Sequence, residues 1–474
     1  MQRSILPGLS AVLAACAHPA PPAPSPSSPP AAAPGARAEQ AALYALPLVI
    51  MDLTREQFLS DPLGAGVTPD RFLHIPILGN PSFRSVVRPN VDTLYSAAWL
   101  DLSAEPVLLT VPPSDGRYYL IQCMDAWTNV FAAPGIRTLG HRGATYAIVG
   151  PDWHGPVPPQ AEVVRAPTPI VWVLGRVYVR DPDDLGAARA FQRQLDLRPA
   201  SHAGDAAFQA VVPQRRPAAN VNRPIMRDQL RSLGPAAFYE RFARLAATNP
   251  PSPADPAFVR DVLTPLGLAP GAPLTWLAVD EATRTALAAA LDHVLTILAD
   301  PEQRRTASTV SPTHWSSMAP GLGQGSYGTG YAARAAVAMI GLGANLRIDA
   351  LYMNASTDAA GQPLDGSKHY RLRFAAGQAP PVHGFWSVTL YDEQGYLIAN
   401  PAERYAVKSG DPLPAEPDGA LVIDLAPDDP GAARHASWLP TPAGQRFELS
   451  LRAYWPDDAL LQGRWSPPAV EPVP

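Results

Sequence analysis

Three residue types that could act on a substrate lie close together early in the sequence, at Asn90, Asp92 and Tyr95. A carboxylate at Asp92 would act as a general acid or base, and Asn90 would donate a hydrogen bond to a carbonyl or a sugar hydroxyl. The same residues also suit a turn, because Asn and Asp side chains accept hydrogen bonds from the backbone that follows them. We keep both interpretations: a catalytic Asp92 with Asn90 and Tyr95 binding substrate, or an Asx-turn before a strand.

A second set combines a carboxylate, an aromatic ring and an amide at Asp125, Trp127 and Asn129. If all three lie in one strand, their alternate spacing projects them from the same face. The indole of Trp127 would then cover the apolar face of a sugar or flat ligand, and Asn129 would hold its polar groups. Asp125 is the second candidate for proton transfer. The alternative is a core tryptophan with two polar neighbours.

The third set is Tyr327, Tyr331 and Arg334, which we expect on the first turn of a helix. A guanidinium at Arg334 would bind a carboxylate or phosphate of a substrate in bidentate fashion. It would equally pair with an Asp of a neighbouring domain, and the sequence leaves that choice open.

Two residues of the C-terminal part complete the candidate substrate-binding set, Trp386 and Arg452. Trp386 also suits core or interface packing. Arg452 stands in an apolar strand, so it needs a carboxylate or carbonyl partner if it points inward. Arg452 is then either a structural residue paired within the protein or a residue that binds a ligand.

These sets support two hypotheses about function. In the first, the protein is a hydrolase or lyase acting on a glycan or small polar metabolite, in a cleft between domains where the sets converge. In the second, it is a non-catalytic module that binds a glycan, a small ligand or another protein. We favour the enzyme.

The elements that must position these residues are mainly short strands separated by turns. Apolar or alternating runs occur with turn sequences between them, a rhythm typical of antiparallel sandwiches or barrels. In the first half and then in the second, the runs are Thr93–Leu100, Val107–Val111, Arg117–Met124, Thr145–Val149, Ile170–Val179, Tyr370–Phe374, Phe385–Tyr391, Tyr396–Ala399, Ala420–Leu425 and Phe447–Tyr454.

Helical spacing of apolar residues appears in three places. It predicts helices over about Gln40–Leu59, with a possible break at Pro47, over Asp280–Leu298, and over Tyr331–Leu342. We therefore predict a mainly β fold with a helical insert: an N-terminal sandwich over 39–185, a mainly helical connecting segment over 186–345 and a C-terminal sandwich over 346–474.

The N-terminal residues predict export. A mostly apolar run from Ser4 to Ala15 follows one positive charge and indicates a signal peptide over residues 1–15. Leu13-Ala14-Ala15-Cys16 resembles the bacterial lipobox, in which the chain is cut before the Cys and the thiol carries lipid. We expect lipidation of Cys16, a Pro/Ala-rich linker over 16–38, and a protein tethered to the periplasmic face of the outer membrane. The alternative is an ordinary signal peptide with an incidental Cys16.

Composition argues against several classes of protein. The net charge is −5, only 17% of the residues are charged, and the sequence contains no Lys/Arg cluster, so nucleic-acid binding is not expected. The ten His residues are scattered and the two Cys are far apart, so no cofactor is indicated. A metal assembled from distant residues stays open, and the oligomeric state is not indicated. Cys123, in an apolar strand, is expected to be an inert buried thiol.

Several longer motifs carry a family resemblance. The stretches Pro89–Ser96, Asp115–Tyr119 and Asp125–Asn129 resemble a bacterial family called domain of unknown function 1254. The stretches Phe385–Asp392 and Leu451–Pro456 are similar to its usual companion, domain of unknown function 1214. The resemblance covers nearly all of residues 40–470. Gly330 departs from the family, which usually has Asn there, and the family often has Tyr at the position of Trp127.

The resemblance implies a fold and no reaction. It implies two jelly-roll-like antiparallel β-sandwich domains joined by an α-helical segment. The names of both domains record that their function is unknown, so the site residues above depend on their chemistry alone.

Overall fold

The computed structural model describes residues 34–60, 67–84, 86–210, 225–300, 308–319 and 322–473, and residues 34–474 form one compact unit. The expected signal peptide, Cys16 and the linker as far as Ala33 lie outside the described residues. The linker was expected to reach residue 38, but residues 34–38 already belong to the first helix, α1 (Pro34–Leu59).

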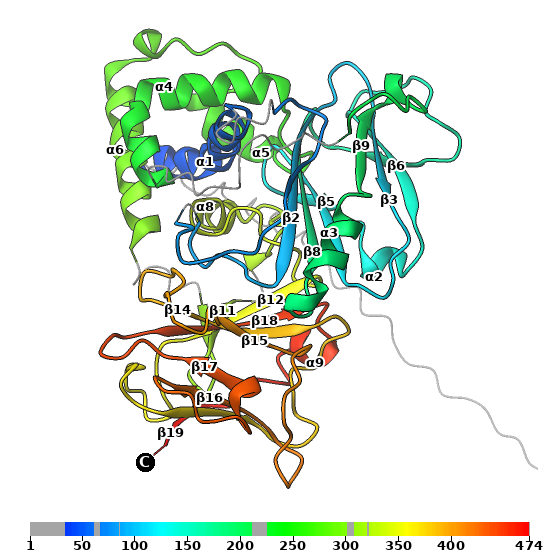
Figure 1. The fold of residues 1–474 in the computed structure, drawn as a ribbon. Helices are drawn as coiled ribbons and strands as arrows, with labels where there is room; N and C mark the ends of the chain where they lie inside the picture. Colours follow the sequence, from blue (N-terminus) through cyan, green and yellow to red (C-terminus); the bar gives the residue numbers. More distant parts are fainter. Residues whose placement is uncertain are drawn as a thin grey trace, which may run out of the picture. The chain divides into compact units, whose positions relative to one another are not determined.

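The N-terminal half contains a five-stranded sheet of order β1-β2-β8-β4-β5 and a four-stranded sheet of order β7-β6-β3-β9 (Figure 1). Their strands are β1 (Leu73–Ile75), β2 (Thr93–Asp101), β3 (Val107–Val111), β4 (Tyr119–Asp125), β5 (Val130–Ala132), β6 (Ala144–Val149), β7 (Glu162–Arg165), β8 (Ile170–Tyr178) and β9 (Asp196–Pro199). Leu94, Ile121 and Val173 of the first sheet and Leu109 and Ile148 of the second belong to one buried cluster. The two sheets therefore face each other across a shared core.

The C-terminal half repeats this arrangement with a six-stranded sheet, β10-β11-β12-β18-β14-β15, and a four-stranded sheet, β17-β16-β13-β19. Their strands are β10 (Ser308–Val310), β11 (Ser316–Met318), β12 (Ala350–Ala355), β13 (Tyr370–Phe374), β14 (Trp386–Tyr391), β15 (Ala406–Lys408), β16 (Leu421–Ala426), β17 (Trp438–Pro440), β18 (Glu448–Tyr454) and β19 (Val470–Pro472). Leu390 and Leu451 of one sheet share a core with Leu372 and Ile423 of the other.

The sheets differ from the expected antiparallel ones in two pairings. β6 and β7 are parallel, and so are β16 and β17, so two of the four sheets are mixed. The run Tyr396–Ala399 was expected to be a strand and is not one. The Asp392 carboxylate accepts a hydrogen bond from the Tyr396 backbone N–H, at 2.7 Å, and this closes a turn before the run.

Helices lie before the first sheet and along the predicted helical insert, and short ones also occur within both halves. They are α1, α2 (Ile136–Leu139), α3 (Leu185–Gln192), α4 (Met226–Thr248), α5 (Pro256–Phe258), α6 (Glu281–Ala299), α8 (Tyr331–Ile340) and α9 (Asp458–Leu461). The three helices expected from apolar spacing are present as α1, α6 and α8, and α1 continues through Pro47. The segment 186–345 is less helical than expected, because β9, β10 and β11 also lie in it.

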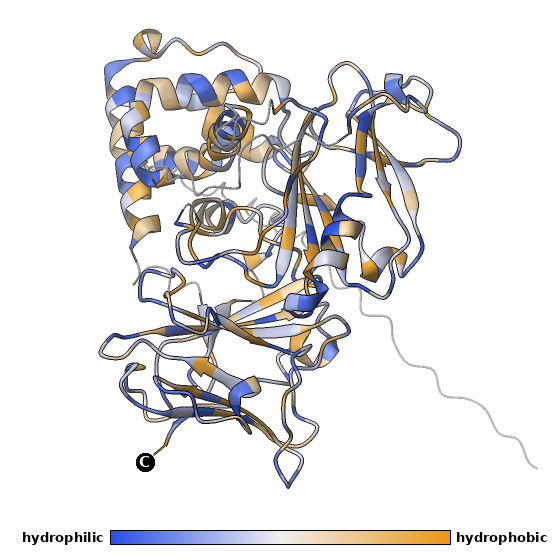
Figure 2. Ribbon diagram, viewed as in Figure 1, coloured by the Kyte–Doolittle hydropathy of each residue, from blue (hydrophilic) through white to orange (hydrophobic). Residues whose placement is uncertain are grey.

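α1 packs against helices that follow it by about two hundred residues or more of sequence. It contacts α4, α6 and α8 (Figure 1), and Leu46, Phe242, Leu291 and Ala335 share one buried core. Figure 2 shows apolar and polar residues alternating along α4 and α6, as expected of helices with one buried face. Among the described helices, none combines the length and the hydrophobicity that a membrane-spanning segment requires.

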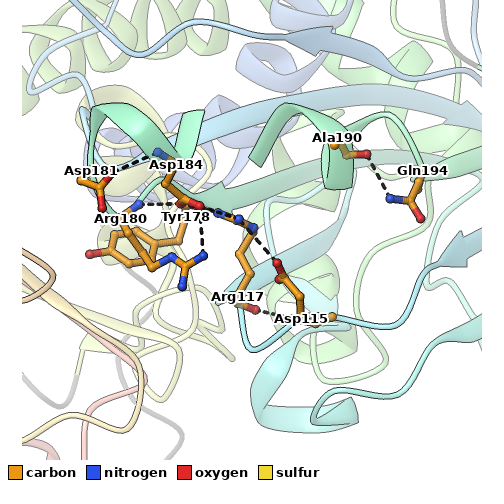
Figure 3. A network of polar contacts seen from close by, with 9 residues as sticks. Asp115, Arg117, Tyr178, Arg180, Asp181, Asp184, Ala190 and Gln194 are labelled. Atoms are coloured by element: carbon orange, nitrogen blue, oxygen red, sulfur yellow. Dashed lines mark hydrogen bonds and ion pairs between the residues drawn. The ribbon is translucent and has the colours of Figure 1, made fainter. Parts of the chain in front are cut away.

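A buried ion pair holds the start of β4 to the segment after β8 (Figure 3). The Arg117 guanidinium donates to both carboxylate oxygens of Asp184, at 2.5 and 2.7 Å, and to the carbonyl of Tyr178, at 2.8 Å. The exposed Arg180 donates to the same carboxylate. Burial alone would raise the pKa of Asp184, but the hydrogen bonds from Arg117 and Arg180 hold it well below its ordinary value.

Cys123 lies within β4, is 1% exposed and is not in a disulfide. Burial raises the pKa of its thiol to about 12. We expect native Cys123 to resist iodoacetamide at pH 8, since its thiolate fraction is about a thousandfold below that of a free thiol. Peptide mass spectrometry should find modification at Cys123 only after unfolding in guanidinium. Rapid alkylation of the folded chain would contradict this.

Candidate functional site

A buried polar layer lies where the five-stranded and six-stranded sheets meet, on the faces turned away from their cores. On one side, Tyr95 of β2 is the cross-strand partner of Arg176 of β8. On the other, Arg452 of β18 is the cross-strand partner of both Tyr352 of β12 and Ser387 of β14. We call this layer the junction site and define it as Asn90, Asp92, Tyr95, Arg176, Tyr352, Ser387, Arg452 and Tyr454.

Hydrogen bonds join the two sides of the junction site. Ser387 donates its hydroxyl proton to Asp92 Oδ2 across 2.7 Å, and the Tyr454 hydroxyl lies 3.5 Å from the same oxygen. The Asn90 amide donates to the Tyr454 hydroxyl at 2.6 Å. Asp92 is 0% exposed, and its other oxygen, Oδ1, has no hydrogen-bond partner among the described residues. One buried carboxylate oxygen of Asp92 therefore has unused acceptor capacity.

Asn90 also makes the turn that was the alternative interpretation of its motif. Its Oδ1 accepts the backbone N–H groups of Asp92, at 2.6 Å, and Thr93, at 3.1 Å. The Asx-turn and the contact with Tyr454 use different atoms of one amide. The turn therefore orients Asn90 toward the junction site.

Two buried arginines of the junction site bind only neutral acceptors. Arg452, 3% exposed, donates to the Thr389 hydroxyl at 2.8 Å, the Tyr391 hydroxyl at 2.5 Å and the carbonyl of Arg88 at 3.0 Å.

Arg176, 5% exposed, donates to Gln122 Oε1 and the Gly343 carbonyl, both at 2.9 Å. Neither arginine forms an ion pair with a carboxylate of the described residues. The junction site therefore contains two positively charged guanidinium groups and one carboxylate, that of Asp92.

Two phenols of the junction site, those of Tyr352 and Tyr454, are protonated at neutral pH and can donate. Burial raises the pKa of Tyr454, and the nearby Asp92 carboxylate raises it further. Burial likewise raises the pKa of Tyr352. Asn90, Tyr95 and Tyr352 are partly exposed, whereas Asp92, Ser387 and Tyr454 are fully buried.

A second buried cluster gathers around Arg334 of α8. Its guanidinium carbon lies 5.1 to 5.3 Å from the ring centroids of Tyr44, Trp127 and Tyr331, distances typical of cation–π contacts. The Tyr44 and Tyr331 hydroxyls donate to Asp255, at 2.8 and 2.6 Å. We call these residues, together with Asp125, the Arg334 cluster. They join α1, α8, the segment before α5 and the turn after β4.

Asp125, Trp127 and Asn129 do not share a strand, contrary to our expectation. β4 ends at Asp125, whose Oδ1 accepts the backbone N–H groups of Trp127, at 2.9 Å, and Asn129, at 2.8 Å. These bonds close a turn, and Thr128 adopts a positive φ of 72° within it. Trp127 is 2% exposed and packs in the helical core, so the turn buries the ring.

Two further expectations need correction. Tyr327 does not share a helix with Tyr331, because α8 begins at Tyr331 and Tyr327 lies buried in the preceding loop. Trp386 belongs to the core of the C-terminal half, which is the packing role considered for it, and does not face the junction site.

The sequence candidates are thus divided between two places. Asn90, Asp92, Tyr95 and Arg452 lie in the junction site, while Asp125, Trp127, Tyr331 and Arg334 lie in the Arg334 cluster, with Asn129 on the Asp125 turn. No hydrogen bond or ion pair between described residues links the two places. Arg176, Tyr44 and Asp255 were not anticipated, and no motif in the sequence singles them out. Within the described ranges, no group of three or more His, Cys, Asp or Glu side chains is placed to hold a metal ion.

Family models match two segments of the chain. Residues 69–199 match a protein of unknown function, DUF1254, and residues 349–458 match a second, DUF1214. The first segment contains Asn90, Asp92, Tyr95 and Arg176, and the second contains the remaining residues of the junction site. Tyr44, Asp255 and Arg334 lie in neither. No curated protein matches the chain.

A solved structure shares its fold. The VPA0106 protein from Vibrio parahaemolyticus is 23% identical, with a TM-score of 0.68 over 93% of this chain and 100% of that one. An uncharacterised protein from Burkholderia cenocepacia is 12% identical, with a TM-score of 0.41 over 93% and 92% of the two chains. The first of these likenesses indicates a common architecture.

Proposed function

Because the chain belongs to the two-domain family in which DUF1254 is followed by DUF1214, we propose a function for the site that the two matched segments build together. The protein is a hydrolase or lyase, and its substrate is a small polar metabolite that carries a carboxylate or phosphate. The observation that supports this most is the pair of buried guanidinium groups, Arg176 and Arg452, which bind only neutral partners.

An anionic substrate follows from the charges. Removing a charged group from water costs several kcal/mol unless an opposite charge compensates it. The junction site holds two guanidinium groups and one carboxylate, so an anion beside Arg176 and Arg452 balances the layer. Planar guanidinium groups suit carboxylates and phosphates in particular, because their N–H groups match the spacing of the oxygens.

Asp92, Ser387 and Tyr454 supply the proton transfers. Asp92 takes a proton from the attacking water or Ser387 hydroxyl in a hydrolase, or from a carbon beside the anionic group in a lyase. Tyr454 is protonated and donates to the leaving group. Asn90 and Tyr95 border the layer and orient the substrate.

A second candidate function is a binding module without catalysis, whose ligand is a glycan, a small molecule or a protein. The complete burial of Asp92 and Ser387 favours it, because a reacting substrate must reach both groups.

The remaining proposals concern architecture and location. Each pair of facing sheets is a jelly-roll-like sandwich, and the helices between them form the connection. The chain is exported and lipid-anchored through Cys16 at the periplasmic face of the outer membrane, as the lipobox-like residues 13–16 suggest. Labelling with an alkyne fatty acid, with Cys16→Ser as control, tests the anchor.

Anion binding is tested first, with inorganic phosphate and succinate as probes and sodium chloride at equal ionic strength as control. We expect phosphate or succinate to raise the melting temperature, since an anion at a hundred times its Kd adds about 2.7 kcal/mol of stability. Arg452→Lys keeps the positive charge and should retain a smaller shift, while Arg452→Met should lose it. Equal shifts with all three salts would exclude an anion site.

Catalysis is tested by Asp92→Asn with Asp125→Asn as the matched control, since both carboxylates are buried. On p-nitrophenyl phosphate and p-nitrophenyl hemisuccinate, Asp92→Asn should lower kcat by about 100-fold or more while anion binding persists. Asp125→Asn should keep activity. Anion binding without turnover of either ester by the wild type would favour the binding module.

A further inference from the structure

A buried lysine lies beside the junction site, on a strand that contributes no residue to the site as defined. Lys408 of β15 is 9% exposed and is the cross-strand partner of Ser387 of β14. Side chains of such partners project from the same face of a sheet. The preceding residue, Val407, belongs to the core on the opposite face, as strand alternation requires. Lys408 therefore continues the row of junction residues by one strand.

The ammonium group of Lys408 binds backbone carbonyls. Its Nζ donates to the carbonyl oxygens of Val91 and Val179, both at 3.2 Å. It forms no ion pair with a carboxylate of the described residues. Burying an ammonium group without an adjacent carboxylate costs stability, so a role other than stabilising the fold is indicated.

The turn after β15 fixes the backbone from which this side chain extends. Asp411 Oδ2 accepts the backbone N–H of Lys408 at 2.8 Å. In return, the backbone N–H of Asp411 donates to the Lys408 carbonyl at 3.1 Å. Two hydrogen bonds between the same two residues close the turn, so the ammonium group starts from a defined position.

The two carbonyls that Lys408 binds hold the backbone on both sides of Asp92. Val91 precedes Asp92 in the chain, and the backbone N–H of Val179 donates to the Asp92 carbonyl at 2.9 Å. One ammonium group therefore joins the peptide before Asp92 to the segment that binds the peptide after it. The Asp92 carboxylate accepts the hydroxyl proton of Ser387, the neighbour of Lys408 on the sheet, at 2.7 Å.

We propose that Lys408 is a positioning residue for Asp92: it fixes the backbone of Asp92 so that the carboxylate stays directed at Ser387. Lys408 lies in the segment that matches DUF1214 and Asp92 in the segment that matches DUF1254, so one half of the chain positions the carboxylate of the other. The inference rests on the proposed function, in which Asp92 transfers a proton.

Loss of a positioning residue should change turnover more than binding, because a displacement of about 1 Å can lower a rate by roughly 100-fold. Lys408→Met removes the ammonium group and keeps the length of the side chain. On p-nitrophenyl phosphate and p-nitrophenyl hemisuccinate, we expect kcat to fall by about 10- to 100-fold. KM should stay nearly unchanged, since Arg176 and Arg452 remain. Lys408→Gln keeps N–H donors for the carbonyls and should lose less.

Arg137→Met is the matched control, measured like the others at a temperature where every variant is folded. Arg137 also joins the N-terminal half to the C-terminal half, because its guanidinium donates to both carboxylate oxygens of Asp349, at 2.6 and 3.1 Å. It donates to no residue of the junction site. Arg137→Met should therefore keep its kcat, and equal losses in Arg137→Met and Lys408→Met would overturn the proposal.

A double variant separates positioning of Asp92 from general support of the fold. If Lys408 acts through Asp92, Lys408→Met should cause no further loss of kcat in a chain that already carries Asp92→Asn. A residue that supports the site in another way would lower kcat by the same factor in both backgrounds. That result would also overturn the proposal.

Amide hydrogen exchange tests the same contact without a substrate. In Lys408→Met we expect roughly fivefold faster exchange in peptides covering residues 91–93 and 177–180, as the loss of a hydrogen bond predicts, and no change there in Arg137→Met. Faster exchange without turnover of either ester by the wild type would support the positioning of Asp92 and contradict the proposed function. Unchanged exchange in Lys408→Met would overturn the positioning role, whatever the activity.

Discussion

Arg117→Met is expected to lower the free energy of unfolding by about 3–5 kcal/mol, because it removes one partner of a buried, bidentate ion pair. The Arg117 side chain is 0% exposed and that of Asp184 is 6% exposed. Without Arg117, the Asp184 carboxylate keeps only the exposed Arg180 as a cationic partner. Urea denaturation at pH 7 measures the difference.

Arg180→Met is the matched control, because it breaks an ion pair to the same carboxylate from a side chain that is 51% exposed. Exposed pairs contribute about 0–1 kcal/mol, so this variant should unfold close to wild type. If both variants lose the same stability, burial does not set the strength of this network.

Asp125→Asn is expected to change how stability depends on pH. Burial raises the pKa of Asp125 to about 6, although hydrogen bonds from Asn129 and Trp127 and the charge of Arg334 oppose the rise. The unfolded carboxyl titrates near 3.8. Between these values the folded chain binds more protons than the unfolded chain, so this group lowers stability as the pH rises from 4 to 6.

Above pH 6 the loss in free energy of unfolding caused by ionisation of Asp125 is complete, and it amounts to about 3 kcal/mol. The free energy of unfolding of Asp125→Asn, relative to wild type, should therefore increase by up to that amount between pH 4 and pH 8. The difference between the two proteins removes the contributions of the other titrating groups. Parallel curves across this range would show that Asp125 titrates at its ordinary pKa.

The sequence could predict those strands and helices that are long enough for the spacing of their apolar residues to show a helical or strand periodicity. Val107–Val111 and Tyr370–Phe374 were placed with the observed bounds, and α6 differs from its predicted range by one residue at each end. Strands of three residues, such as β1 and β5, show no alternation and were missed. The two-domain resemblance is confirmed by the family matches.

The site was less predictable, for a physical reason. Asn90, Asp92 and Arg452 were chosen by chemistry and do lie together, because polar residues in strands must find buried partners. The prediction for Asp125, Trp127 and Asn129 was wrong because it assumed that the strand continues past Asp125. The Asp125 side chain instead accepts hydrogen bonds from the backbone that follows it, and the strand ends there. Arg176 was missed because its relation to Arg452 depends on how two distant sheets meet.

The packing of α1 also constrains the order in which the chain can acquire its structure. α1 is made first, yet its partners α4, α6 and α8 end at residue 340. Until those helices have left the ribosome, the apolar face that contains Leu46 and Ile50 has no native partner to cover it. Exposed apolar surface of that kind is prone to aggregation. A holdase that binds nascent chains should therefore protect this protein chiefly through its N-terminal helix.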